Sequence, residues 1–199
     1  MRRTLMNMTA AMLLCLTATT GAWALTPTET VKSRVDEALQ SLGQSAGGSV
    51  EARRVEIRRV ADSLFDFTEM SRRALGRHWA DRTAAEREEF VRLFTDLMAR
   101  SYIGKMDRYA GEAIAYTGER VDGDEASVQS QVVTAKGSRI PVEYRLHRAS
   151  EGWTAYDVFI ENVSLVGTYR SQFDRVIRTE SFASLLERLR QKDRVADAR

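Results

Sequence analysis

The sequence has few of the residues from which disulfides, metal sites and many active sites are built. Its 199 residues include one cysteine, Cys15, and two isolated histidines, His78 and His147. A single cysteine excludes a disulfide within the chain, and isolated histidines do not form a metal-binding motif. A phosphate-binding glycine loop and a nucleophile elbow are also missing. We therefore expect no metal, no cofactor and no enzymatic activity.

The first residues have the layout of a secretory signal peptide. Arg2 and Arg3 precede an apolar run over residues 10–16, and Ala22-Trp23-Ala24 follows as a small-x-small cleavage site. The run is about half of the ~20 apolar residues that a bilayer-spanning helix needs, and no later segment is long enough either. We expect residues 1–24 to be a signal peptide and residues 25–199 to form a single domain outside the cytoplasm.

Helical spacing of apolar residues and capping signals predict helices at both ends of this domain. The pairs Thr26/Glu29 and Thr83/Glu86 each have the spacing of a capping box, which marks the start of a helix. Asp66 and Gly76 bound a shorter segment as cap and stop signal. The expected helices cover residues 27–43, 50–64, 66–76 and a long segment from residue 84, and helical spacing returns after Asn162.

Between the helices, from Ile114, the apolar period changes to two, which is typical of strands. Ile140, Val142 and Tyr144 alternate with polar residues, and turn signals at residues 122–124, 136–137 and 150–152 divide the region. Pro141 cannot donate to a ladder, so we expect an edge strand or a bulge there. The predicted fold is α+β, with helices packed on one face of a curved antiparallel sheet of about four strands.

One pair of residues has the chemistry of an acid–base site. Tyr156 and Asp157 adjoin on a predicted strand, and a carboxyl group with a raised pKa in an apolar cone, beside a tyrosine, can move protons. Adjacent strand residues point to opposite faces, however, so the two share a cavity only if a bulge intervenes. Periodicity alone favours an ordinary filled core for the surplus of aromatic residues and methionines, and composition does not separate such a core from one with a cavity.

Several blocks of the sequence resemble the MlaC family, also called the toluene-tolerance or auxiliary-transport family. The blocks lie at residues 65–70, 74–79, 90–109, 140–146, 153–158, 163–165 and 169–173, in the order in which that family has them. The most specific blocks are Ala-Leu-Gly-Arg-His-Trp at 74–79 and Tyr-Arg-Ser-Gln-Phe at 169–173. Asn162 departs from the pattern, because glycine is more usual there, and this puts the geometry of that turn in doubt.

The resemblance implies a periplasmic lipid carrier with an apolar cavity between sheet and helices. Such a carrier shuttles phospholipid between the outer membrane and an inner-membrane ABC transporter, and so maintains the lipid asymmetry of the outer membrane. The implied partners are phospholipid, an inner-membrane ABC transporter complex with a lipid-binding membrane subunit, and an outer-membrane lipoprotein complex. A nucleic-acid partner is not expected. The expected lipid-binding residues are Phe67, Met70, Phe94, Met98, Tyr102, Val142, Tyr144, Tyr169 and Phe173.

Periodicity also predicts where the lipid lies. Alternation places Val142 and Tyr144 on one face of a strand, and spacings of four place Phe94, Met98 and Tyr102 together on the longest helix. We expect these two faces to oppose each other, with Tyr169 and Phe173 closing one side. Three alternatives remain open: a carrier of a hopanoid-type lipid, an enzyme that uses Tyr156 and Asp157 in a cone-shaped cavity, and a lipid-free adaptor that docks proteins.

Overall fold

The computed structural model describes residues 25–44, 50–106, 113–134, 137–150 and 152–197, so the expected signal peptide lies outside the described residues. The helices are α1 (Pro27–Gln44), α2 (Val50–Leu64), α3 (Phe67–Leu75), the 3-10 helix η2 (Gly76–Trp79), α4 (Ala84–Met106), α5 (Leu165–Thr179) and α6 (Phe182–Asp197). The strands are β1 (Ala113–Asp122), β2 (Glu125–Val133), β3 (Arg139–Ala149), β4 (Gly152–Ile160) and β5 (Val163–Ser164). Among the described helices, none combines the length and the apolar character that a membrane crossing requires.

The strands form one open sheet in the order β1-β2-β3-β4-β5, with every neighbouring pair antiparallel. This arrangement confirms the predicted α+β class and meander, to which β5 adds a short fifth strand. Gly123 and Gly137 have φ values of 59° and 79° in the connections between strands, where glycine adopts a left-handed backbone without a steric penalty. The sequence therefore specifies the hairpins by local turn chemistry.

Pro141 does not lie on an edge strand, because β3 pairs with β2 on one side and with β4 on the other. The ladder between β3 and β4 ends at the pair Val142 and Ile160. Beyond it, the Pro141 carbonyl accepts a hydrogen bond of 3.0 Å from the N–H of Glu161. The amide nitrogen and the carbonyl of a residue in an antiparallel strand face the same neighbour. The missing N–H of Pro141 thus faces the side on which the ladder has ended, and it costs no ladder hydrogen bond.

The helix starts follow the predicted caps. Thr26 and Glu29 form a reciprocal capping box, with hydrogen bonds of 2.8 and 3.2 Å between backbone N–H groups and side chains. Thr83 and Glu86 form the same box at the start of α4, again at 2.8 and 3.2 Å. At α3, the Asp66 carboxylate accepts a 2.8 Å hydrogen bond from the N–H of Glu69. Each of these three helices therefore begins where its sequence signal predicts.

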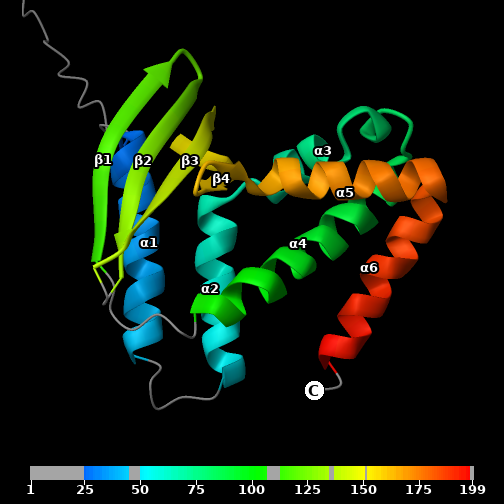
Figure 1. The fold of residues 1–199 in the computed structure, drawn as a ribbon, viewed down its shortest axis with the longest axis horizontal. Helices are drawn as coiled ribbons and strands as arrows, with labels where there is room; N and C mark the ends of the chain where they lie inside the picture. Colours follow the sequence, from blue (N-terminus) through cyan, green and yellow to red (C-terminus); the bar gives the residue numbers. More distant parts are fainter. Residues whose placement is uncertain (1–24, 45–49, 107–112, 135–136, 151, 198–199) are drawn as a thin grey trace, which may run out of the picture.

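Two clusters of apolar side chains hold the molecule together. The sheet cluster comprises Val31, Leu64, Ala126, Val128, Leu146, Trp153 and Ala155. The helical cluster comprises Met70, Ala74, Leu75, Phe90, Leu93, Phe94, Leu97, Met98, Tyr156, Val166, Phe173, Phe182, Leu185, Leu186 and Leu189. Figure 1 shows α1 lying along the sheet, α4 to α6 to one side of it, and α2 between the two parts. The helices therefore form two groups: α1 lies along the sheet, and α4, α5 and α6 pack together beside it (Figure 1).

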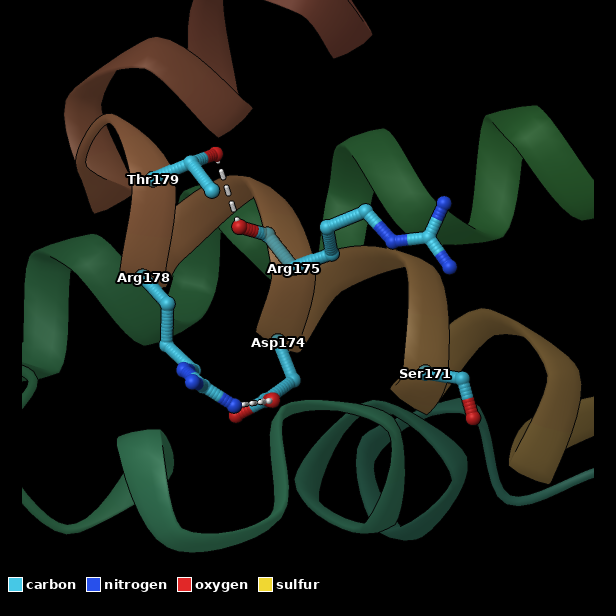
Figure 2. A pocket seen from close by; sticks show the side chains of 5 residues that line it. All are labelled: Ser171, Asp174, Arg175, Arg178 and Thr179. Atoms are coloured by element: carbon cyan, nitrogen blue, oxygen red, sulfur yellow. Dashed lines mark hydrogen bonds and ion pairs between the residues drawn. The ribbon is translucent and has the colours of Figure 1, made fainter.

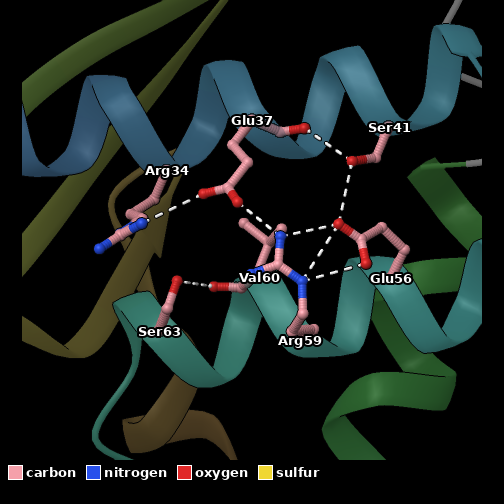
Figure 3. A network of polar contacts seen from close by, with 7 residues as sticks. All are labelled: Arg34, Glu37, Ser41, Glu56, Arg59, Val60 and Ser63. Atoms are coloured by element: carbon pink, nitrogen blue, oxygen red, sulfur yellow. Dashed lines mark hydrogen bonds and ion pairs between the residues drawn. The ribbon is translucent and has the colours of Figure 1, made fainter.

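Polar contacts fix α1 in place. The Glu119 carboxylate of β1 accepts a 2.7 Å hydrogen bond from the N–H of Thr28 at the start of the helix. Farther along, Glu37 accepts hydrogen bonds from Arg59 of α2 and from Arg34, which lower the pKa of its carboxyl group (Figure 3). Exposed ion pairs of this kind contribute little to stability. Their role here is to set how α1 lies against α2.

Candidate functional site

The face of the sheet that meets α1, here called the inner face, is covered at one end only. Leu146 of β3 is fully buried and belongs with Val31 of α1 to the sheet cluster. Farther back along the same strand, Tyr144, Val142 and Ile140 point to the same face by alternation but are only half-buried. The covering by α1 therefore weakens toward the start of β3.

The neighbouring strands continue this incompletely covered surface. Val132 of β2 lies directly opposite Ile140, and Ile114 of β1 lies opposite Val132. Ile160 of β4 lies opposite Val142. We call this set the open apolar half of the inner face: Ile114, Val132, Ile140, Val142, Tyr144 and Ile160. It forms a continuous apolar surface across four strands.

Tyr144 joins this surface to the sheet cluster. Burial raises the pKa of its phenol to about 12, because a surrounding of low dielectric constant disfavours the phenolate. The side chain nevertheless keeps some accessible area, while it packs against the sheet cluster. Nearby, the buried hydroxyl of Ser130 donates a 3.1 Å hydrogen bond to the carbonyl of Val142, so this polar group is satisfied within the sheet. The surface that remains is apolar.

The predicted site residues of the helices lie in a different environment. Phe94 is fully buried, and its ring lies 5.7 Å from Phe90, 5.5 Å from Phe173 and 5.2 Å from Tyr169. Met70 and Met98 are buried in the same helical cluster, and Tyr169 packs against it. Rings at these distances make favourable stacked and edge contacts. This part of the helical cluster is packed as a core.

The two predicted faces belong to different clusters of the described residues. Phe94 and Met98 belong to the helical cluster, whereas Tyr144 packs against the sheet cluster. Phe67, also predicted, packs against the helical cluster beside Phe65 at 5.9 Å, and the side chain of Tyr102 lies outside the described residues. Periodicity identified both faces as buried, and the opposition of the two faces across a cavity stays a prediction. Lipid binding by the nine predicted residues stays a prediction.

Sequence reasoning missed the apolar neighbours of Val142 on the adjoining strands. Ile140 has the same alternation as Val142, so it could have been found within its own strand. Val132, Ile114 and Ile160 needed the register of β1, β2 and β4, which depends on a bulge near Thr117 in β1 and another in β4. Bulges leave no reliable signal in a single sequence.

The bulge in β4 bears on the pair Tyr156 and Asp157. Arg145 pairs with Asp157 while Leu146 pairs with Ala155, so Tyr156 is the extra residue. Because of the bulge, the side chains of Tyr156 and Asp157 are both buried. Their contacts, however, are with residues that hold the fold together. The carboxylate of Asp157 accepts hydrogen bonds from the N–H groups of Val158 and Val166 and from the Ser164 hydroxyl.

Tyr156 also makes structural contacts. The guanidinium of Arg73 lies 3.7 Å from the centre of its ring, which is the distance of a cation–π contact. The ring itself is part of the helical cluster. Tyr156 and Asp157 thus anchor α3 and α5 to β4, and their described contacts are those of structural residues.

A shallow depression on α5 is polar. It is lined by Ser171, Asp174, Arg175, Arg178 and Thr179, and Figure 2 shows that these side chains all come from α5. The Asp174 carboxylate faces Arg178 at 3.7 Å, and the Thr179 hydroxyl donates to the carbonyl of Arg175 at 2.9 Å. A surface hollow lined by charged groups does not suit hydrocarbon.

The two most specific sequence blocks meet beside this depression. Gly76 has a φ of 53°, and a Cβ atom there would lie 2.8 Å from Nε of Arg170. Arg77 and His78 both contact one carboxylate oxygen of Asp174, at 2.7 and 2.9 Å. Residues almost a hundred positions apart thus form a single joint between η2 and α5.

Taken together, these features define an α+β protein with an open antiparallel meander, one incompletely covered apolar sheet face and a separate helical core. The family model described as "MlaC protein" matches residues 29–191, and the chain belongs to the MlaC family. The family predicted from the sequence blocks is confirmed. Among solved structures, the chain is similar to a phospholipid-binding protein from Ralstonia solanacearum in complex with a phospholipid. The two are 26% identical with a TM-score of 0.73, over 81% of this chain and 93% of that one.

Proposed function

We propose that the protein is a lipid carrier that holds the acyl chains of a phospholipid against the open apolar half of the inner face. The observation that carries the proposal is geometric. The register of β1, β2 and β3 joins half-buried apolar side chains into one surface, which α1 covers fully only near Leu146. Such a surface suits hydrocarbon chains. Membership of the MlaC family and the phospholipid bound by the Ralstonia protein support the same reading.

The energetics of transfer explain why a carrier needs this surface. Two acyl chains contain roughly 30 methylene groups, and exposing each to water costs ~0.8 kcal/mol, so bare transfer would cost on the order of 20 kcal/mol. An apolar surface enclosed by the sheet and the helices removes most of that cost. The carrier makes and breaks no covalent bond, which fits the structural roles of Tyr156 and Asp157.

The family membership also supports a place for the carrier in the cell. We infer that residues 1–24 export the chain to the periplasm, where it carries phospholipid between the outer membrane and an inner-membrane ABC transporter complex. A lipid-binding membrane subunit of that complex and an outer-membrane lipoprotein complex would be its docking partners. This traffic would maintain the lipid asymmetry of the outer membrane.

One preparation tests the proposal. Protein purified from the periplasmic fraction should begin at Leu25 and, by native mass spectrometry, carry phospholipid at about one molecule per chain. Delipidation should lower the melting temperature by about 5–10 °C, because a ligand present at 100 times its Kd stabilises the fold by ~2.7 kcal/mol and 1 kcal/mol corresponds to ~2–4 °C at this size. A polycyclic lipid in the extract would indicate a hopanoid carrier. The carrier function would be refuted if the preparation contained no lipid and its melting temperature did not change when phospholipid was added.

A further inference from the structure

A row of apolar side chains leads from the inner face to the outside of the molecule. Val142 of β3 lies opposite Ile160 of β4, and Ile160 lies opposite Val163 of β5. Directly opposed residues of antiparallel strands share a face, so the three side chains stand side by side. Exposure increases along the row: Val142 is half-buried, Ile160 is 37% exposed and Val163 is 60% exposed. We call this row the apolar ramp.

The turn between β4 and β5 holds the ramp in position. Glu161 and Asn162 are its two central residues, with φ values of 51° and 65°. A two-residue hairpin turn with both φ values positive matches the twist of the strands, and asparagine tolerates this backbone better than glutamate. The N–H of Glu161 is tied to the Pro141 carbonyl at 3.0 Å. The chain thus accepts an unfavourable backbone at Glu161, and this turn presents Ile160 and Val163 on one face.

At the opposite edge of the sheet, the inner-face position of β1 opposite Val128 is Glu119, whose carboxylate is bonded to the first turn of α1. A charge and a helix therefore separate the apolar side chains of that edge, Ile114 and Val121. Among the exposed large apolar side chains of the described residues, Ile160 and Val163 are the only two that are cross-strand partners.

We propose that the apolar ramp is the track along which a phospholipid acyl chain slides between a bilayer and the open apolar half of the inner face. This inference rests on the proposed function. Its basis is that the exposed end of the ramp, Val163, continues without a break into the half-buried Val142. An acyl chain on this track stays in contact with apolar groups at each step, which lowers the barrier to loading and release.

The test compares two single variants of the full chain. Val163→Gln makes the exposed end of the ramp polar without adding charge, and it leaves the open apolar half unchanged. Val55→Gln is the matched control, because Val55 on α2 is 63% exposed and lies outside the ramp. The probe is transfer of a phosphatidylethanolamine with a fluorescent tail from vesicles of phosphatidylethanolamine and phosphatidylglycerol. Circular dichroism and bound lipid at equilibrium are measured on the same samples.

We expect the ramp variant to load and release lipid about tenfold more slowly than the wild type, with unchanged lipid content at equilibrium. The control should transfer at the wild-type rate. Equal rates for the two variants would overturn the ramp, and so would a folded ramp variant that no longer holds lipid, because Val163 would then belong to the pocket. Failure of the proposed function is distinguishable, since the wild type itself would then take up no lipid from the vesicles.

Discussion

Replacing Met98 or Val142 by glutamate distinguishes a packed core, expected around Met98, from a hollow, expected beside Val142. Met98 is 6% exposed within the helical cluster, so a glutamate there has no access to water. Keeping the carboxyl group protonated at pH 7, against a usual pKa near 4.3, costs about 4 kcal/mol. The lost apolar burial adds about 1.5–3 kcal/mol. The sum is comparable to the whole stability of a typical domain, roughly 5–15 kcal/mol, so Met98→Glu should unfold the protein or nearly so.

The same change at Val142 should have a different effect. Val142 is half-buried, so a glutamate side chain reaches water and costs about 1 kcal/mol of apolar contact, or ~2–4 °C in melting temperature. A carboxylate against the acyl chains should weaken lipid binding by at least about tenfold. Val133→Glu is the matched control, because Val133 is also a half-buried valine, and its strand position places it on the opposite face of the sheet.

The assay combines thermal unfolding by circular dichroism with phospholipid extracted per mole of protein. Val133→Glu should keep both its fold and its lipid, and Val142→Glu should keep its fold and lose lipid. The assignment of the two environments would be refuted if Met98→Glu stayed folded and lost its lipid, since Met98 would then line the cavity. Unfolding of Val142→Glu with an intact Val133→Glu would refute the hollow next to the sheet.

Two further predictions concern the joint between η2 and α5. The pKa of Asp174 is lowered by its hydrogen bond from His78 and then by that from Arg77, so the joint stabilises the fold above pH 3.8 and loses this effect as the pH falls through the lowered pKa. Asp174→Asn should therefore melt below the wild type at pH 7, and the difference should shrink as the pH falls below 3.8; a difference independent of pH would contradict this. Gly76→Ala places a Cβ atom at a φ of 53° and should cost about 1–2 kcal/mol, or ~2–8 °C. Gly76→Asn should lose no less, because the Gly76 ψ of −125° lies outside the left-handed region that asparagine tolerates. A wild-type melting temperature for either variant would disprove backbone strain at Gly76.

The elements of this fold were readable from the sequence because their signals are local. Thr26, Asp66 and Thr83 each cap the helix that they were expected to start, and the turn residues divide the meander as predicted. Local chemistry decides these features, since a cap or a hairpin turn involves residues within four positions of one another. The same locality explains why the two family blocks were recognisable before their contact was known.

The candidate site was readable only in part, because it depends on which buried faces meet. Alternation put Val142 and Tyr144 on one face correctly, but nothing in the stripe of Phe94 and Met98 says whether it packs on a sheet or on other helices. The hydrophobic effect is non-directional, so the sequence does not show which of two apolar faces of similar length packs against a given third face. The bulge at Tyr156 places neighbouring residues of β4 in different clusters: Tyr156 in the helical cluster and Ala155 in the sheet cluster.

The rings of the helical cluster come from distant parts of the chain. Phe90 of α4 lies 5.5 Å from Phe173 of α5 and 6.2 Å from Phe182 of α6, and the whole sheet intervenes in sequence. Contacts of such high sequence separation form late and slow folding. As the chain is synthesised, α4 emerges long before the helices that cover it, and its aromatic side stays exposed in the interval. Incomplete chains are therefore the species most prone to aggregate, and the last two helices protect the first half of the core.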